Sequence, residues 1–385
     1  MTRTIVLLAP VFVSLFWAVT LTGNTKLHST PRLFLSKFMI FPLICFITHF
    51  LYFSGLREVY YFFDFPYQYA GSLILPVYYI YFKLLTIDQK FSFKAHARYL
   101  IIPFIVATLY CIGALLAPRD EYHTWLFNEM SFPDSPYILF LGIMRMILRI
   151  QFLVLVVLTV IGNYRLIRKY GHSAEQFYSD LDDGKYNNAK MLNYSILIIC
   201  GASFVAVVVG RSLLIPKDYT IYMVWSIITI MLYIMGYIGF KQKPLNPAFD
   251  QELPIEKQQH PDATLSSAQS KILHKMILLF DEKKLYLNSQ LNIMDIVNMV
   301  GTNRTYISSI INQQYNQNFC TFVNSYRIDE LKRVLTENPE STNDMLADKC
   351  GFGSVISLKR AVSSKTGLSM CDFRNQLLKS GKNNE

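Results

Sequence analysis

The stretch LNIMDIVNMVGTNRTYISSIIN, residues 291–312, decides the fold of the C-terminal part of the chain. Its apolar residues recur at helical spacing on both sides of Gly301. Glycine adopts the left-handed backbone at low steric cost and Asn303 suits a helix N-cap, so one helix ends at Gly301 and another follows Asn303. Three isoleucines share one face of the second helix: Ile307, Ile310 and Ile311. This stretch predicts a helix-turn-helix motif.

A second stretch with the same organisation follows about fifty residues later. Ser341 and Asp344 resemble a capping box, Gly351 can form the turn, and Ser354 can cap the next helix. The apolar face repeats at Leu358, Ala361 and Val362. A longer helix, from Phe319 to about Thr336, separates the two motifs. We expect this helix to fix their separation.

Polar side chains are predicted on the outward face of the second helix of each motif. In the first motif they are Arg304, Thr305, Ser308, Ser309 and Asn312, and in the second they are Ser357, Lys359 and Arg360. Arginine can bond guanine through two hydrogen bonds, and hydroxyl groups can bond bases or phosphates. For each residue the alternatives are a phosphate contact or a solvated face. Either motif also suits a helical bundle that binds protein.

The chain as a whole is too apolar to be an average soluble globular protein. Of the 385 residues, 52% are hydrophobic, 15% are aromatic and only 17% are charged. Part of the chain must therefore be solvated by lipid. The formal net charge of +10 suits anionic lipid headgroups or nucleic acid, and charge alone does not separate these two partners.

Seven charge-poor apolar segments approach the length that crosses about 30 Å of hydrocarbon. They are Thr4–Thr22, Phe38–Gly55, Phe65–Phe82, Tyr99–Ala117, Tyr137–Ile161, Met191–Gly210 and Tyr219–Phe240. The third is the shortest and the fifth contains two arginines, so six or eight segments remain alternatives. The sequence predicts an all-α protein with a polytopic N-terminal domain of about seven spans.

The charges between these segments predict the orientation of the chain. The loops after the first, third and fifth segments hold most of the lysines and arginines, and Lys241 and Lys243 open the tail. By the positive-inside rule, the N-terminus lies outside and everything after Phe240 lies in the cytoplasm, as in a multi-pass protein of the inner, cytoplasmic membrane. The alternative is a cleaved signal peptide with Arg3 as its charged region, which would leave the C-terminal domain outside the cell and contradict the loop charges.

A proline-containing polar stretch separates the two parts of the chain. Residues 241–264 hold Pro244, Pro247, Pro254 and Pro261 and have no apolar run, which indicates an extended linker. The predicted domains are therefore a transmembrane sensory domain over residues 1–240, this linker, and a helix-turn-helix domain over residues 265–385.

Three ionisable residues fall inside the predicted spans. Arg145 and Arg149 are four residues apart, so they share a helix face in the fifth span, and His49 lies in the second. Ionisable groups at membrane depth are costly and tend to face the interior of the bundle, which makes these residues candidates for sensing a small-molecule or lipid signal. The alternatives are that the arginines bond loop carbonyls or snorkel, and that His49 is structural.

The sequence gives no indication of an enzyme. It contains no GxxxxGK[ST], HExxH or GxSxG motif. Its six cysteines form no CxxC pair and have no neighbouring histidine, so we expect neither a metal site nor disulfides, and predict small buried residues instead. No cofactor is predicted.

The C-terminal hundred residues resemble the DNA-binding domain of AraC-type (AraC/XylS) transcriptional regulators. The residues that carry this resemblance in the first motif are Tyr306-Ile307-Ser308 and Tyr326-Arg327-Ile328 with Leu331. In the second motif they are Leu346-Ala347, Cys350-Gly351-Phe352, Ser354, Arg360, Gly367 and Phe373-Arg374. AraC-type domains fused to multi-span membrane regions are a recognisable architecture.

Several positions depart from the family pattern. The second motif has Ser357 and Leu358 in place of an aromatic pair, Val362 in place of Phe, and Met370 in place of Pro, and the first motif has Val297 in place of Ala. These core substitutions stay small or apolar and are compatible with the fold. The outward Val355 and Ile356 are unusual for a base-reading helix, which favours the first motif over the second as the source of sequence specificity.

The resemblance implies that the second helix of each motif enters successive major-groove segments of promoter DNA. Base-edge candidates are then Arg304, Thr305, Ser308 and Ser309 in the first motif, and Ser357, Lys359 and Arg360 in the second. Two hypotheses follow. The chain is either a membrane-embedded transcriptional regulator, which can form a homodimer, or a membrane receptor or transporter whose helical tail binds a cytoplasmic protein.

Overall fold

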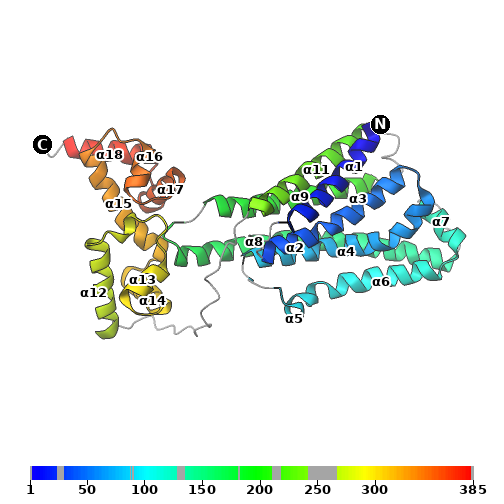
Figure 1. The fold of residues 1–385 in the computed structure, drawn as a ribbon, viewed down its shortest axis with the longest axis horizontal. Helices are drawn as coiled ribbons and strands as arrows, with labels where there is room; N and C mark the ends of the chain where they lie inside the picture. Colours follow the sequence, from blue (N-terminus) through cyan, green and yellow to red (C-terminus); the bar gives the residue numbers. More distant parts are fainter. Residues whose placement is uncertain are drawn as a thin grey trace. The chain divides into compact units, whose positions relative to one another are not determined.

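A computed structural model describes residues 2–23, 30–86, 88, 91–127, 135–180, 183–209, 218–241 and 267–382. Over these residues the regular structure is helical apart from one isolated antiparallel bridge between Tyr178 and Asn292, which confirms the all-α prediction for this part of the chain (Figure 1). The contacts divide the chain into two compact units. We call residues 1–167 with 188–250 the apolar unit, and residues 168–187 with 251–385 the C-terminal unit.

Helices at all seven predicted apolar segments are present in the structure. These seven are α1 (Thr2–Thr20), α3 (Ile40–Phe53), α4 (Arg57–Thr86), α6 (Ile101–Leu116), α8 (Pro136–Phe177), α9 (Asp183–Val209) and α11 (Asp218–Lys241). The shorter elements between them are α2 (Thr30–Phe38), α5 (Phe93–His96), the 3-10 turn η2 (Ala97–Tyr99) and α7 (Arg119–Phe127). Gly210, the predicted end of the sixth segment, lies outside the described residues.

Four helices of the described chain are long and apolar enough to cross a membrane. They are Thr2–Thr20, Pro31–Phe53, Pro136–Phe177 and Tyr219–Lys241, and a fifth is added if Phe93–Tyr99 and Ile101–Leu116, which meet at 57°, form one span. The other two predicted segments, in α4 and α9, are helical but are not among these candidates. The structure therefore supports a membrane protein with four or five candidate spans.

The apolar unit is held by lengthwise helix packing. α1 packs against α11 and α3, and α4 packs against α3 and α6 (Figure 1). On α11, Gly236 lets the Trp17 indole of α1 approach so closely that a methyl group at this position would collide with the ring. Large apolar side chains such as Met146, Val157 and Leu158 of α8 are exposed, as expected of a surface solvated by lipid.

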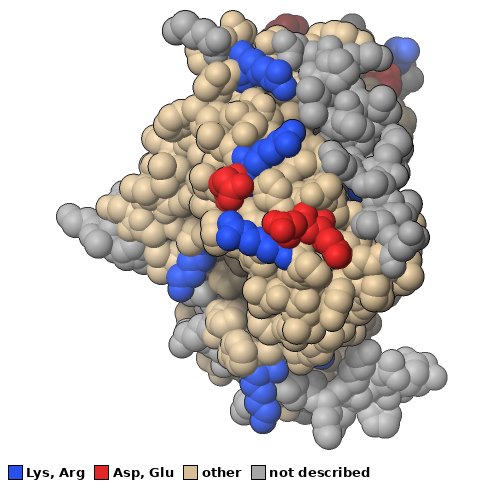
Figure 2. Space-filling model, turned by 90° about the vertical axis from the view of Figure 1, so that its right-hand side faces the viewer, with Lys and Arg blue, Asp and Glu red and all other residues tan. Residues whose placement is uncertain are grey.

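Charged side chains are sparse on the face of the protein that Figure 2 shows. Lys, Arg, Asp and Glu are scattered there, and most of the visible described surface belongs to other residues. This sparseness agrees with the composition of the apolar unit. It contrasts with the surface of a typical soluble domain, which is rich in interspersed charges of both signs.

The C-terminal unit contains two helix-turn-helix motifs. Its elements after the apolar unit are α12 (Ser267–Asp281), the 3-10 turn η4 (Leu285–Leu287), α13 (Ile293–Val300), α14 (Arg304–Tyr315), α15 (Phe319–Glu337), α16 (Asn343–Lys349), α17 (Val355–Thr366) and α18 (Met370–Lys382). α13 and α14 form the first motif, α16 and α17 form the second, and α15 connects them, as predicted.

The turn of the first motif has the predicted local chemistry. Gly301 has a left-handed φ of 76°, and the Asn303 side chain caps α14 by accepting from the Tyr306 amide at 2.9 Å. In addition, Asn292 and Asp295 form a capping box at the start of α13. The predicted buried face of α14, made by Ile307, Ile310 and Ile311, is confirmed.

The second motif agrees with the prediction except at its first cap. Gly351 has a φ of 78°, and the Ser354 hydroxyl accepts from the Ser357 amide at 3.1 Å. The N-cap of α16 is Thr342, not Ser341 as predicted. Ser341 is buried, and its amide donates to the Asn338 carbonyl oxygen in the turn that precedes the helix, so the helix begins one residue later.

The end of α8 belongs to the C-terminal unit. The contacts group residues 168–187, which include the last turns of α8, with residues 251–385. The predicted domain boundary places these residues in the membrane domain. Apart from Lys241, the predicted linker over residues 241–264 lies outside the described residues.

Most of the cysteines are buried, as predicted. Cys111, Cys200, Cys320 and Cys350 are buried and Cys45 is partly buried. Cys371 is exposed on the first turn of α18, so the prediction is wrong for this residue. Within the described part of the chain, no group of three or more His, Cys, Asp or Glu side chains is arranged to hold a metal ion.

Candidate functional site

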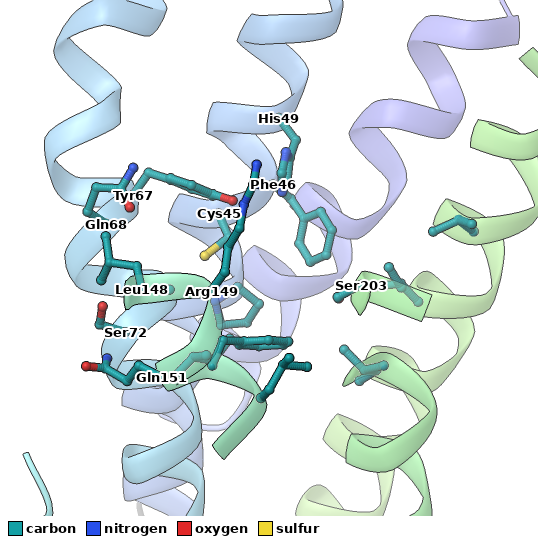
Figure 3. A pocket seen from close by; sticks show the side chains of 18 of the residues that line it. Cys45, Phe46, His49, Tyr67, Gln68, Ser72, Leu148, Arg149, Gln151 and Ser203 are labelled. Carbon is teal, nitrogen blue, oxygen red and sulfur yellow. The ribbon is translucent and has the colours of Figure 1, made fainter. Parts of the chain in front are cut away.

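The three predicted intramembrane residues line one pocket of the apolar unit. The pocket has a volume of about 490 Å³, within the range typical of small-molecule sites. Arg145 and Arg149 reach it from α8, and His49 reaches it from α3. Figure 3 shows the Arg149 side chain directed into the pocket between Tyr67 and His49. Most of the remaining lining is apolar, and it is contributed by α2, α3, α4, α8, α9 and α11.

His49 lies among aromatic rings. Its ring meets Tyr67 at 5.3 Å and Trp225 at 5.8 Å in edge-to-face geometry, and Phe46 lies at 6.0 Å. Edge-to-face contacts of this kind hold a ring in one orientation. Together with Arg149, these rings give the pocket a polar, aromatic end that differs from its aliphatic walls.

Arg145 is held by a set of buried partners. Its guanidinium lies 3.8 Å from the centroid of the Trp125 ring, and its Nη2 donates to the Tyr110 hydroxyl at 3.3 Å. The stacking is a cation–π contact, which strengthens when the cation is desolvated. Arg145 is therefore a structural residue of the pocket wall as well as a lining residue.

Asp64 is the centre of this buried network. It is 1% exposed, and its carboxylate accepts from Tyr122 at 2.6 Å, from Tyr110 at 2.9 Å and from Gln68 at 3.0 Å. Since Tyr110 also accepts from Arg145, the tyrosine hydroxyl links the buried anion to the partly buried cation. A buried charge that is neither paired nor hydrogen-bonded would be strongly destabilising at this depth.

Asp64 was not among the predicted site residues, because the third charge-free segment starts at Phe65, immediately after this carboxylate. A charged residue inside an otherwise helical apolar pattern is the signal that would have identified it. The structure shows that α4 begins at Arg57 and continues through Asp64.

The pocket lining carries one net positive charge. Its formally charged members are two cations, Arg145 and Arg149, and one anion, Asp64. With apolar walls and a cationic, aromatic end, the pocket is suited to a molecule that has an apolar body and an anionic or hydrogen-bond-accepting headgroup.

The predicted DNA-reading residues lie on α14 and α17 of the C-terminal unit. On α14, Thr305 and Asn312 are exposed, and Arg304, Ser308 and Ser309 are partly exposed. On α17, Lys359 and Arg360 are exposed. Seven of the eight predicted side chains therefore have surface exposure. We call these seven residues the reading face.

Ser357 does not belong to this face. It is 3% exposed and its hydroxyl lies 3.3 Å from the Ser354 hydroxyl, so the prediction that it faces outward is wrong. Ser357 is one residue before Leu358 and four before Ala361, which places it on the buried side of α17. The exposed position on this turn is Ile356.

The end of α8 contacts the reading face. We call residues 174–180 the clasp. The guanidinium of Arg304 lies 5.4 Å from the centroid of the Phe177 ring, and Arg360 pairs with Asp180 at 3.7 Å. Asp180 also accepts from the Gly353 amide at 2.7 Å. Both motifs are therefore in contact with the clasp.

The clasp is anchored through Ser179, which is fully buried. Its carbonyl oxygen accepts from Arg327 Nη1 at 3.0 Å, and its hydroxyl accepts from Nη2 at 2.9 Å. Its amide donates to the Leu291 carbonyl oxygen at 3.0 Å. The Cys320 thiol also donates to the Ser179 carbonyl oxygen at 3.4 Å.

Burial of this anchor shifts the ionisation of its members. Desolvation lowers the pKa of Arg327 to about 10, an effect that the nearby Asp180 carboxylate partly offsets. Desolvation also raises the pKa of the Cys320 thiol to about 12. Near neutral pH the arginine is charged and the thiol is protonated, which are the forms that donate to Ser179.

Comparisons with protein-family models, with curated proteins and with solved structures find no match for this chain. The resemblance to AraC-type regulators thus rests on the residues quoted from the sequence.

Proposed function

We propose that this chain is a membrane-embedded, sequence-specific DNA-binding transcriptional regulator of the AraC type. The observation that carries the proposal is a pair of helix-turn-helix motifs in one compact unit, each with polar side chains exposed on its second helix. The same chain contains several helices able to span a membrane. Seven spans, with the C-terminal unit in the cytoplasm of a bacterial cell, would bring this face to the chromosome.

The signal proposed for the apolar unit is a small molecule or lipid with an apolar body and an acceptor headgroup. The apolar walls of the pocket would bury the body, and Arg149 and His49 would face the headgroup. This proposal is supported by the net positive charge of the lining and by the volume of the pocket. A signal held there would act on DNA binding without a diffusible messenger.

The first test is a DNA titration of the full-length chain in lipid nanodiscs. We expect it to bind a duplex from the region upstream of its own gene, to resist competition by unrelated duplex, and to weaken steeply as salt is raised, because phosphate contacts release counterions. If no duplex binds at any salt concentration, the proposal fails. Capture of a cytoplasmic protein without affinity for DNA would favour the alternative, a membrane receptor with a docking tail.

The orientation has its own test. Ser92 follows the third predicted segment and Asp120 follows the fourth, and both are exposed. In a background without the exposed Cys371, Ser92→Cys should react with a membrane-impermeant maleimide only after cells are opened, whereas Asp120→Cys should react in intact cells. The reverse pattern would place the C-terminal unit outside the cell.

A further inference from the structure

We infer that the clasp is an internal competitor for DNA, whose carboxylates occupy phosphate positions on the reading face until a signal displaces it. The inference rests on the proposed function, because it requires that this face binds DNA. It goes beyond that function by assigning to one segment of the chain the means by which binding is held back.

Asp180 uses the donors that a DNA phosphate would need. Its Oδ2 accepts from the amide of Gly353, the residue before the N-cap Ser354 of α17, and its Oδ1 pairs with Arg360. Backbone amides at a helix N-terminus and arginine side chains are common phosphate ligands in protein–DNA complexes. A docked Asp180 therefore withholds both groups and adds a negative charge that repels the duplex.

Two further contacts extend the competition to the connecting helix α15 and to the first motif. The Glu175 carboxylate accepts from the side-chain amide of Asn318, the N-cap of α15, at 3.3 Å. The ring of Phe177 lies against the guanidinium of Arg304, a base-edge candidate. The clasp thus pairs acidic or aromatic groups with polar groups of both motifs.

The docking is specific, since it completes a buried hydrogen-bond set. Arg327 is fully buried, and two of its donor atoms bond Ser179. The amide of Ser179 and the bridge between Tyr178 and Asn292 add backbone pairing to the segment that precedes α13. A segment held only by surface charge would lack these fixed partners.

The same helix supplies the clasp and two residues of the candidate signal pocket. α8 runs without interruption from Pro136 to Phe177, so Arg145, Arg149 and the first residues of the clasp are parts of one helix. A change at the pocket that rotates or shifts α8 would then pull on Ser179 and Asp180. In this proposal the docked and released clasp are the two states of a coupled equilibrium.

The charge of the clasp is tested with Asp180→Asn in the full-length chain in nanodiscs. The amide keeps an oxygen for the Gly353 amide and loses the charge. We expect promoter affinity to rise roughly fivefold or more, in the range of typical coupling between sites. The matched control is Asp329→Asn, which removes the same charge from an exposed carboxylate that pairs with Lys332. Equal affinity of Asp180→Asn and Asp329→Asn would overturn the inference.

A reversible lock tests the docking itself. A Cβ added to Gly353 would lie 3.9 Å from the Asp180 Cγ, so the two side chains are near enough to test Asp180→Cys with Gly353→Cys as a disulfide pair. In a background without Cys371, the oxidised pair should bind promoter DNA weakly, and a reductant should raise its affinity to that of Asp180→Asn. The single variant Asp180→Cys controls for the redox treatment. A locked form that binds as tightly as the reduced form contradicts the inference.

These outcomes separate the two proposals. If the wild type binds DNA and neither the charge change nor the lock alters affinity, the clasp inference fails while the proposed function stands. If the wild type, Asp180→Asn and the reduced cysteine pair all fail to bind any duplex, the proposed function fails and the clasp inference fails with it.

Discussion

The guanidinium of Arg327 donates to both the carbonyl and the hydroxyl oxygen of Ser179, 148 positions earlier in the chain. Its other short bonds go to the carbonyl oxygens of Tyr286 and Asn288. Because Arg327 is fully buried, each of these acceptors replaces water that the cation has lost. The end of α8 is therefore part of the hydrogen-bonded core of the C-terminal unit.

Ser179→Ala should loosen this core. The substitution removes one acceptor from a buried cationic donor, which costs about 1–3 kcal/mol. We expect faster hydrogen exchange at the amides of α15 in the full-length chain, while Ser325→Ala, which removes an exposed hydroxyl bonded to Thr321, leaves exchange unchanged. Identical exchange in both variants would show that Ser179 does not support Arg327.

Substitutions of Lys359 and Ser357 should distinguish a side chain that contacts DNA from one that packs inside the domain. Lys359 is exposed on α17, so Lys359→Ala should weaken binding to all duplexes and lower the salt slope by about one. Lys379→Ala, an exposed charge on α18, is the matched control. Ser357 is buried, and Ser357→Ala should change stability more than salt dependence. A change in the salt slope for Ser357→Ala would return this residue to the reading face.

The helix-turn-helix motifs could be predicted because their determinants are local. Gly301, Asn303 and Ser354 act on backbone groups within a few residues, and the buried faces of α14 and α17 follow from helical spacing. The shift of one cap from Ser341 to Thr342 shows the limit, since either hydroxyl fits the pattern and a hydrogen bond to Asn338 decides between them.

The clasp and the Asp64 network could not be predicted by the same means. The contacts of Ser179 and Asp180 join residues more than a hundred positions apart, and nothing local marks their partners. Asp64 could not be predicted from charge-free spans, because such spans exclude the carboxylate that accepts the buried hydrogen bonds. Ser357 was misplaced because its polarity was given more weight than its position on the helix.

Gly236 should be intolerant of a side chain. A Cβ at this position would collide with the Trp17 indole, whereas nothing lies within 4 Å of a Cβ added at Gly201 on α9. Overpacking of a tight helix contact costs about 1–3 kcal/mol. Gly236→Ala should therefore lower the thermal unfolding midpoint of the chain in nanodiscs, and Gly201→Ala should not. Equal midpoints would mean that α1 and α11 pack less closely.

Asp64 and Arg145 should behave as a coupled pair. Asp64→Asn removes the carboxylate that is linked to Arg145 through the Tyr110 hydroxyl, so each single substitution should lower stability. Removing both charges with Asp64→Asn and Arg145→Gln should cost less than the sum of the single changes. Thermal unfolding of the four proteins measures this coupling. Additive effects would show that Tyr110 does not transmit the interaction.

Substitution of Arg149 should change the response of the protein to its signal and leave its stability unchanged. Arg145 contacts the buried Trp125 and Tyr110 in the pocket wall, and the exposed Arg149 side chain is directed into the pocket (Figure 3). Arg149→Leu should therefore keep normal membrane levels and a normal unfolding midpoint but alter target-gene output in cells. Arg145→Leu, by contrast, should lower the midpoint.

A double variant distinguishes a defect in signal sensing from a defect in DNA binding. The double variant with Asp180→Asn and Arg149→Leu should bind DNA as tightly as Asp180→Asn alone, because release of the clasp follows the pocket in the proposed sequence of events. Target-gene output that Arg149→Leu leaves unchanged, at normal protein levels, would remove this residue from the mechanism. Altered output that Asp180→Asn fails to modify would place sensing on a route other than α8.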